Sequence, residues 1–87
     1  MKNLDKPIRF SEHAKEQLRF RGSNEEEVTY SIHNAKWKLA EFGRMECIHE
    51  FPYNKEWNGK FYKHKQVRPI FIEEDRITIV TVYVYYS

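Results

Sequence analysis

The amino-acid sequence predicts an α+β fold, with an N-terminal helical hairpin packed on an antiparallel sheet of three to four strands. Apolar residues recur at helical spacing in the first third of the chain, whereas from Trp37 onward the pattern approaches the period of two that strands show. The chain has 87 residues, which suffice for one hydrophobic core but not for two. Because helical and strand patterns occupy separate parts of the sequence, a single α+β domain over residues 1–87 is expected.

The first part of the chain predicts one short strand and two helices. Residues 7–10 form the strand, and Ser11 is a suitable N-cap for a helix over "SEHAKEQLRFRG" that Gly22 ends. Ser23 and Glu26 have the spacing of a capping box and begin the second helix. Only two or three residues join the helices, so they should form an αα-hairpin. The inner face of the second helix is expected to carry Val28, Ile32 and Ala35.

The remainder of the chain predicts three strands. The segments "RMECIHEFPY" and "FYKHKQVRPIFI" are the first two, a loop at "NKEWNG" joins them, and "EEDR" makes a tight turn. The segment "ITIVTVYVYYS" is almost wholly β-branched or aromatic, so residues 76–86 should form the central, interior strand. Pro69 lies in the strand that precedes the last one. Because proline lacks an N–H, it predicts an edge position or a bulge in its own strand. A regular last strand would place these side chains together on a concave, partly wet face: Ile77, Ile79, Thr81, Tyr83 and Tyr85.

Composition is typical of a soluble globular protein. The chain is 40% hydrophobic, 16% aromatic and 32% charged, which is too aromatic for disorder and too polar for a membrane protein. Cys47 is the only cysteine, so no internal disulfide is expected and a cytoplasmic location follows. Neither a run of 18 apolar residues nor a signal-peptide pattern is present, so no membrane association is expected. Metal-ligand spacing and glycine-rich phosphate loops are also missing from the sequence, so no metal and no cofactor are expected.

Positive charge is concentrated between residues 55 and 68. This segment carries five Lys or Arg against one acidic residue, although the formal net charge of the whole chain is only +2. Phe61 and Tyr62 lie among these cations, and this combination favours a polyanionic partner such as nucleic acid. The alternative is a solvated edge strand, in which lysines discourage aggregation.

Two stretches of the sequence resemble a known protein family. The stretch "FSEHAKEQLRFRGSNEEEV" resembles the N-terminal signature of small prokaryotic BrnT-type toxins, and His13, Arg21 and Gly22 match that signature one by one. The stretch "NGKFYKHKQVRPIFIEEDRITIVTVYVYY" is similar to the C-terminal hairpin of an uncharacterised branch of the same group. This resemblance implies the RelE/ParE-like fold, in which two N-terminal helices lie over a curved antiparallel sheet.

The resemblance also implies a function and partners. It predicts the toxin-like component of a toxin–antitoxin pair, with an antitoxin protein as its partner. RNA or the ribosome would be the target, and the activity would be that of a metal-independent endoribonuclease. The alternatives are a gyrase-directed toxin and a non-catalytic RNA- or protein-binding module of the same fold. Self-association as a homodimer is the alternative use of an exposed strand edge.

RNA cleavage without a metal needs a base for the 2′-OH, cations for the phosphorane and an acid for the leaving oxygen. In a regular strand, neighbouring residues face opposite sides, so the cations of the basic strand cannot all meet one phosphate unless a bulge redirects them. Each candidate also has a structural alternative, such as a helix-end contact or core packing. The expected catalytic residues are His13, His64, Arg68 and Tyr83. The expected RNA-binding residues are Lys60, Lys63, Lys65, Arg21 and Trp57.

Overall fold

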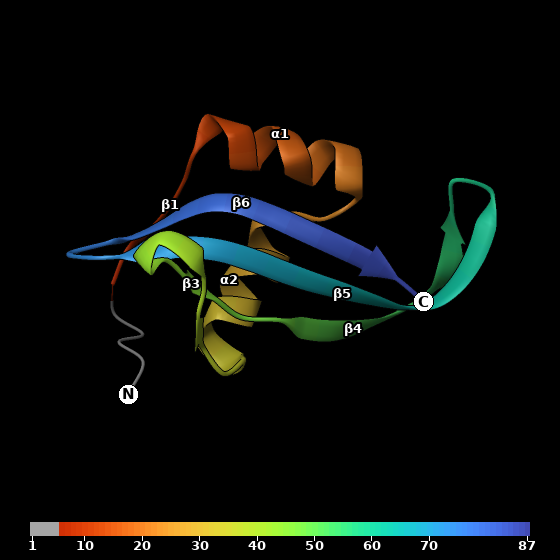
Figure 1. Cartoon of the computed structure of the whole chain (residues 1–87). Helices are drawn as coiled ribbons and strands as arrows, with labels where there is room; N and C mark the ends of the chain where they lie inside the picture. Colours follow the sequence, from red (N-terminus) through yellow and green to blue (C-terminus); the bar gives the residue numbers. More distant parts are fainter. Residues whose placement is uncertain (1–5) are drawn as a thin grey trace.

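The computed structural model describes residues 6–87, which form two helices and a mostly antiparallel sheet (Figure 1). This arrangement confirms the predicted α+β class. The described residues form six strands instead of three to four, because three very short strands add to the sheet. In chain order the elements are β1 (Ile8–Phe10), α1 (Glu12–Arg21), α2 (Glu25–Asn34), β2 (Lys38–Leu39), a 3-10 turn η1 (Glu41–Gly43), β3 (Met45–Glu46), β4 (His49–Trp57), β5 (Lys60–Glu73) and β6 (Ile77–Tyr86).

The strand order is β1-β6-β5-β3-β2, and β4 also pairs with β5. Residues 76–86 were predicted to be interior, and this is confirmed only for Ile77–Ile79, where β6 lies between β1 and β5. Beyond Ile79 no strand pairs with the other side of β6, so within the described residues that side is a sheet edge. The prediction that this strand is the central one is wrong. The central strand is β5, whose 14 residues are enough to pair with β6 on one side and with both β3 and β4 on the other.

Side chains and left-handed backbone define the helix ends. Ser11 caps α1 as predicted, because its side chain accepts a hydrogen bond from the Ala14 N–H at 3.0 Å. Gly22 ends α1 in the left-handed region, with φ 76°. The predicted capping box at the start of α2 is wrong. Asn24 is the N-cap instead and accepts from the Glu27 N–H at 2.8 Å, since it stands one residue nearer to the first helical turn.

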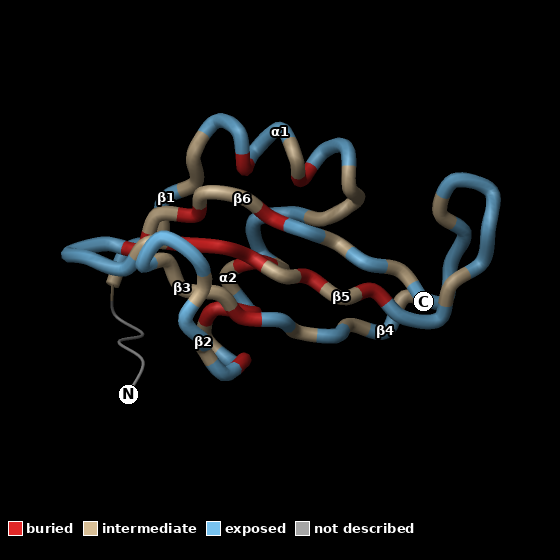
Figure 2. The backbone as a smooth tube through the Cα atoms, in the orientation of Figure 1, coloured by how far each residue is buried: buried red, intermediate tan, exposed pale blue. Residues whose placement is uncertain are grey.

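The hydrophobic core lies on one side of the sheet, beneath the two helices (Figure 2). Here α1 packs along β6 and α2 packs on β5. Trp37 packs against the core, since its ring lies 5.0 Å from that of Phe71 and its indole N–H donates to the Ile32 carbonyl at 2.8 Å. Neither α1 nor α2 packs on the opposite side of the sheet, which we call the open face. The buried core residues include Ala14, Leu18, Val28, Ile32, Val67, Phe71, Ile79 and Val82.

A bulge in β6 decides which of its side chains reach the open face. Val80 has no pairing partner on β5, because Ile79 and Thr81 pair with consecutive residues there. This extra residue reverses the alternation of faces along the strand. Ile77 and Ile79 are therefore buried beneath the helices, whereas Tyr83 is exposed on the open face. The prediction that these isoleucines share a face with Thr81 and Tyr83 is wrong, because it assumed a regular strand.

The β4–β5 hairpin is longer than predicted. A loop was expected over residues 54–59, but β4 continues to Trp57. Asn58 and Gly59 alone make the turn, with φ values of 52° and 84°. Two consecutive residues with positive φ are typical of the tight turn that joins strands through two residues. The expected loop is therefore wrong, since a two-residue turn leaves the flanking residues free to pair.

Pro69 lies within the central strand rather than at an edge. It occupies the point where β5 changes partner from β3 to β4, and its carbonyl accepts a hydrogen bond from the Cys47 N–H at 3.4 Å. The change of partner also divides the predicted strand "RMECIHEFPY" into β3 and β4. The predicted bulge in the strand of Pro69 is wrong, because where the pairing shifts between Ile70 and Phe71 the extra residue is Val80 of β6.

Candidate functional site

Four side chains from three elements meet on the open face: Arg21 of α1, Arg68 of β5, and Tyr83 and Tyr85 of β6. We call them the arginine/tyrosine cluster. The Cζ atoms of Arg21 and Arg68 lie 5.2 and 5.4 Å from the centre of the Tyr83 ring, within cation–π range. Arg68 Nη1 also donates to the Tyr85 hydroxyl at 3.2 Å. The two tyrosines are 38% and 43% exposed, so part of each side chain is accessible from solvent.

Helix α1 positions Arg21 by binding the outer edge of β6. Gln17 Oε1 accepts hydrogen bonds from the Val82 N–H at 2.7 Å and from the Thr81 hydroxyl at 2.6 Å. Arg21 Nη1 donates to the Val82 carbonyl at 2.7 Å. Since Gln17 and Arg21 are four residues apart, they lie on the same face of the helix. That helix face therefore provides hydrogen-bond partners for the backbone of β6 where β1 no longer pairs with it. It also holds the Arg21 guanidinium over Tyr83.

Glu46 of β3 pairs with Arg68 at the rim of the cluster. Arg68 donates from Nε at 2.9 Å and from Nη2 at 3.0 Å to the two carboxylate oxygens, which is a bidentate pair. The hydrogen bond from Arg68 lowers the pKa of Glu46 below its usual 4.5. The bonds to Glu46 and to Tyr85 raise the pKa of Arg68 above its usual value. Because Arg68 uses three of its five N–H donors, two remain for a ligand.

Acid should weaken this pair and with it the fold. The pKa of Glu46 is lower in the folded chain than in the unfolded chain. The pair therefore stabilises the fold above the unfolded pKa, and this contribution disappears as the pH falls through the folded pKa. Urea denaturation at about pH 7 and about pH 3 measures the loss. The Glu46→Gln variant should lose less stability between these pH values than the unaltered chain. A Glu74→Gln control should lose as much as the unaltered chain, and equal losses in both variants would contradict the assignment.

Lys65, an expected RNA-binding residue, lies on the opposite side of the sheet from the cluster. Lys65 is only 6% exposed. The Nζ atom forms an ion pair with Glu27 at 2.8 Å and donates to the Gly22 carbonyl at 2.9 Å. It also lies 5.3 Å from the centre of the Tyr53 ring. Lys65 thus connects β5 to the first turn of α2, and this position leaves no access for a phosphate.

Trp57, another expected RNA-binding residue, packs against the chain itself. Its ring stacks on Tyr86 with centroids 5.0 Å apart and an interplanar angle of 17°. The rings of Tyr53 and Tyr62 also pack on Tyr86, at 5.2 and 5.6 Å. The Tyr86 hydroxyl donates to the Arg21 carbonyl at 2.6 Å, and burial raises the pKa of Tyr86 to about 12. These contacts fold the β4–β5 hairpin back onto the end of α1.

The remaining lysines of the hairpin are exposed. Lys60 Nζ lies 5.5 Å from the centre of the Tyr62 ring, and Lys55 Nζ lies 5.5 Å from that of Tyr53. Within the described part of the chain, no carboxylate forms an ion pair with Lys55, Lys60 or Lys63. These lysines therefore extend the positive surface away from the arginine/tyrosine cluster along the hairpin.

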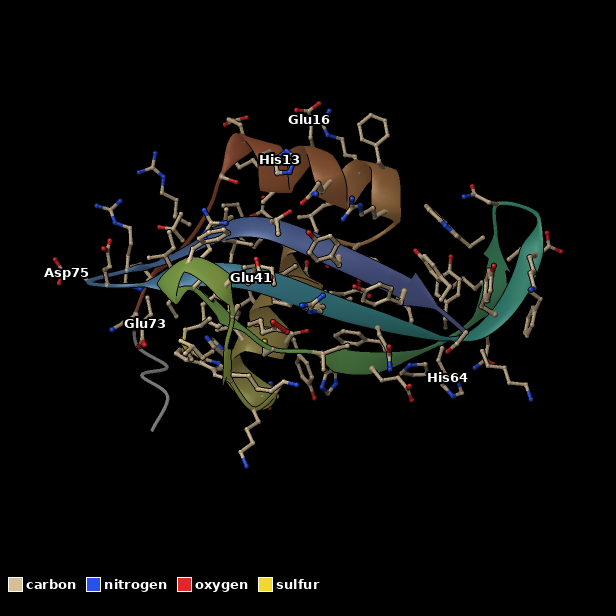
Figure 3. The ribbon with its side chains drawn as sticks, in the orientation of Figure 1. His13, Glu16, Glu41, His64, Glu73 and Asp75 are labelled. Atoms are coloured by element: carbon tan, nitrogen blue, oxygen red, sulfur yellow. The ribbon has the colours of Figure 1, made fainter. Side chains whose placement is uncertain are left out.

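The two histidines expected to transfer protons lie apart (Figure 3). His64 is exposed on β5, four residues from Arg68, which is about 13 Å along an extended strand. His13 is exposed on α1, four residues before Gln17 and eight before Arg21. At that spacing the three side chains lie on one face of the helix. Of the two histidines, His13 is therefore the one on the helix face that borders the cluster.

A groove of about 570 Å³ adjoins the cluster on the open face. Sequence reasoning missed three of its residues, Phe42, Arg44 and Glu46, because they reach the groove through pairing of β2 and β3 with distant parts of the chain. The only local signal is the glycine in "EFGR", which marks a turn. The residues that line the groove are Leu39, Ala40, Glu41, Phe42, Arg44, Glu46, Arg68, Ile70, Thr81 and Tyr83.

Comparison with known proteins adds no relative. No protein-family model, curated protein or solved structure matches this chain. Among residues 6–87, no three His, Cys, Asp or Glu side chains are grouped so that they could hold a metal ion. None of the helices in the same range is long and apolar enough to cross a membrane. The arginine/tyrosine cluster and the groove are thus the features from which a function has to be argued.

Proposed function

We propose that this chain is a toxin-like, RNA-directed protein that binds single-stranded RNA on its open face. The observation that carries the proposal is Tyr83, an exposed ring with guanidinium groups at 5.2 and 5.4 Å. Unpaired bases stack on aromatic rings, and guanidinium groups bind phosphate oxygens with two donors. The resemblance of the sequence to BrnT-type toxins supports the same class of partner.

The distribution of free cations supports the same partner. Arg68 keeps two N–H donors beyond its bonds to Glu46 and Tyr85. Lys60 lies eight residues from Arg68 on the same strand, about 26 Å away if the strand is extended. These two cations lie far enough apart to contact phosphates several nucleotides apart. A polynucleotide backbone therefore suits them better than a single small anion does.

A second candidate is cleavage of the bound RNA, with His13 as the proposed base because it shares a helix face with Gln17 and Arg21. An imidazole is able to take the proton of a 2′-OH near neutral pH. The 2′-oxygen would attack the adjacent phosphorus and release the 5′-oxygen, leaving a 2′,3′-cyclic phosphate. Arg21 and Arg68 would stabilise the charge of the phosphorane, and the Tyr83 hydroxyl would protonate the leaving oxygen. Glu46 is a poor base for this reaction because its pKa is lowered.

Binding is tested by fluorescence anisotropy with a labelled single-stranded RNA of about 12 nucleotides, at several salt concentrations. Tyr83→Ala should weaken binding about tenfold, because stacking of one base contributes about 1–3 kcal/mol. The Lys60→Gln variant should reduce the slope of log affinity against log salt by about 0.7, since each lost contact with single-stranded RNA removes about that much. Phe20→Ala is the matched control, because Phe20 is a 76% exposed aromatic residue of α1 outside the cluster.

The outcomes separate binding from cleavage. A Kd that changes equally in Tyr83→Ala and Phe20→Ala would argue against the open face as the binding surface. Metal-free incubation with RNA and with translating ribosomes, followed by analysis of 2′,3′-cyclic phosphate ends, tests cleavage. If the protein is an enzyme, His13→Asn should abolish these ends while the Kd for RNA stays unchanged. If no ends form with the unaltered chain, binding remains and the catalytic candidate is rejected.

A further inference from the structure

The groove contains an exposed aromatic residue with a strained backbone. Phe42 has φ 59° and ψ 34°, and it is 87% exposed. The left-handed region is unfavourable for a bulky side chain, and such strain is often found where a chain binds something. The next residue, Gly43, also has a positive φ of 70°. The turn thus places an aromatic ring, with little packing of its own, at the lip of the groove.

The other walls of the groove provide apolar surface and charged groups side by side. Ile70 and Thr81 pair with each other across β5 and β6 and form part of the lining. Arg44 stands beside Phe42, and its side chain makes no ion pair or hydrogen bond with any residue of the described range 6–87. Glu46 and Arg68 provide hydrogen-bond acceptors and donors at adjacent positions. A flat heteroaromatic ring that carries a phosphate matches all of these groups.

We propose that the groove binds one unpaired nucleobase of the RNA. The base stacks against Phe42, its polar edge faces Glu46 and Arg68, and its phosphate lies at Arg44. The groove volume of about 570 Å³ lies within the range of small-ligand sites. This inference rests on the proposed function and adds a rule of specificity. A base that is paired in a duplex has its edge occupied and its faces stacked, so the groove selects single strands.

The experiment compares single-stranded RNA of about 12 nucleotides, the same strand in a blunt duplex, and the same strand with one abasic position. Phe42→Gly is the informative variant, because glycine adopts a φ of 59° without strain and the fold is retained. This variant should bind single-stranded RNA about tenfold more weakly, because it loses the stacking of one base, and should bind the duplex unchanged. Arg44→Gln should reduce the salt slope for single strands by about 0.7. Phe20→Ala and Arg76→Gln are controls of the same residue types outside the groove and should have no effect.

An abasic scan gives a second readout that does not depend on the fold. The unaltered chain should lose affinity when the base at one position is removed, and Phe42→Gly should be insensitive to that removal. Two results would overturn the inference but leave the proposed function. In the first, Phe42→Gly loses affinity equally for single strands and for the duplex. In the second, both groove variants bind single strands as the unaltered chain does, while Tyr83→Ala binds weakly. If the unaltered chain binds no RNA, both are overturned.

Discussion

Gly22→Ala is expected to destabilise the fold by about 2–4 kcal/mol, the sum of two effects at one position. Gly22 has φ 76°, and the left-handed region costs a residue with a Cβ about 1 kcal/mol. A Cβ at this position would also lie 2.7 Å from the Trp57 ring and collide with the Tyr86 hydroxyl. Rearranging a packed site around an added carbon costs about 1–3 kcal/mol. Urea denaturation followed by circular dichroism measures the change in the free energy of unfolding.

The chain contains a matched control for this substitution. Gly43 has a similar φ of 70°, and an added Cβ there would have no atom within 4 Å. Gly43→Ala should therefore show only the backbone cost, about 1 kcal/mol. If Gly22→Ala and Gly43→Ala destabilise the fold equally, the contact between the hairpin and the end of α1 is not as close as described.

Lys65→Met should destabilise the fold by about 2–4 kcal/mol, because it removes one partner of a mostly buried ion pair. The side chain of Lys65 is 7% exposed and that of Glu27 is 21% exposed. Without the lysine, the Glu27 carboxylate keeps only the hydrogen bond that Ser23 donates at 2.8 Å, and the Gly22 carbonyl loses its donor. Leaving a charge and a carbonyl without partners in a desolvated position is costly. The measurement is again the free energy of unfolding in urea.

Two further variants separate the loss of the pair from the loss of a lysine. Lys63→Met changes an exposed lysine two residues away on the same strand and should alter stability by no more than about 0.5 kcal/mol. Adding Glu27→Leu to Lys65→Met removes the unpaired carboxylate and should restore part of the lost stability. Similar losses in Lys63→Met and Lys65→Met would mean that Lys65 is not held in a buried pair.

The arginine/tyrosine cluster was only partly predictable from the sequence. Arg21 was expected as a site residue from the resemblance, and Arg68 and Tyr83 from their types and their strands; the structure brings these three together. Their contact depends on Gln17 and Arg21 binding the edge of β6, an interaction between residues more than 60 positions apart. No local pattern encodes such a contact. The groove could not be predicted for the same reason, because its lip comes from the turn between β2 and β3.

The sequence by itself determined the two helices and the longer strands, although not all of their ends. Capping at Ser11, the left-handed Gly22, the Asn58–Gly59 turn and the β-branched last strand depend on residues a few positions apart, so local rules apply to them. Strand alternation already separates Lys65 from Arg68, but the tertiary structure alone decided which of them is buried and which side chains meet Arg68. The unpaired Val80 turns Tyr83 toward Arg68, and Glu27 draws Lys65 into a buried pair. Bulges and ion pairs of this kind arise only when distant strands and helices pack, because their free energy comes from the partner and not from the neighbouring residues.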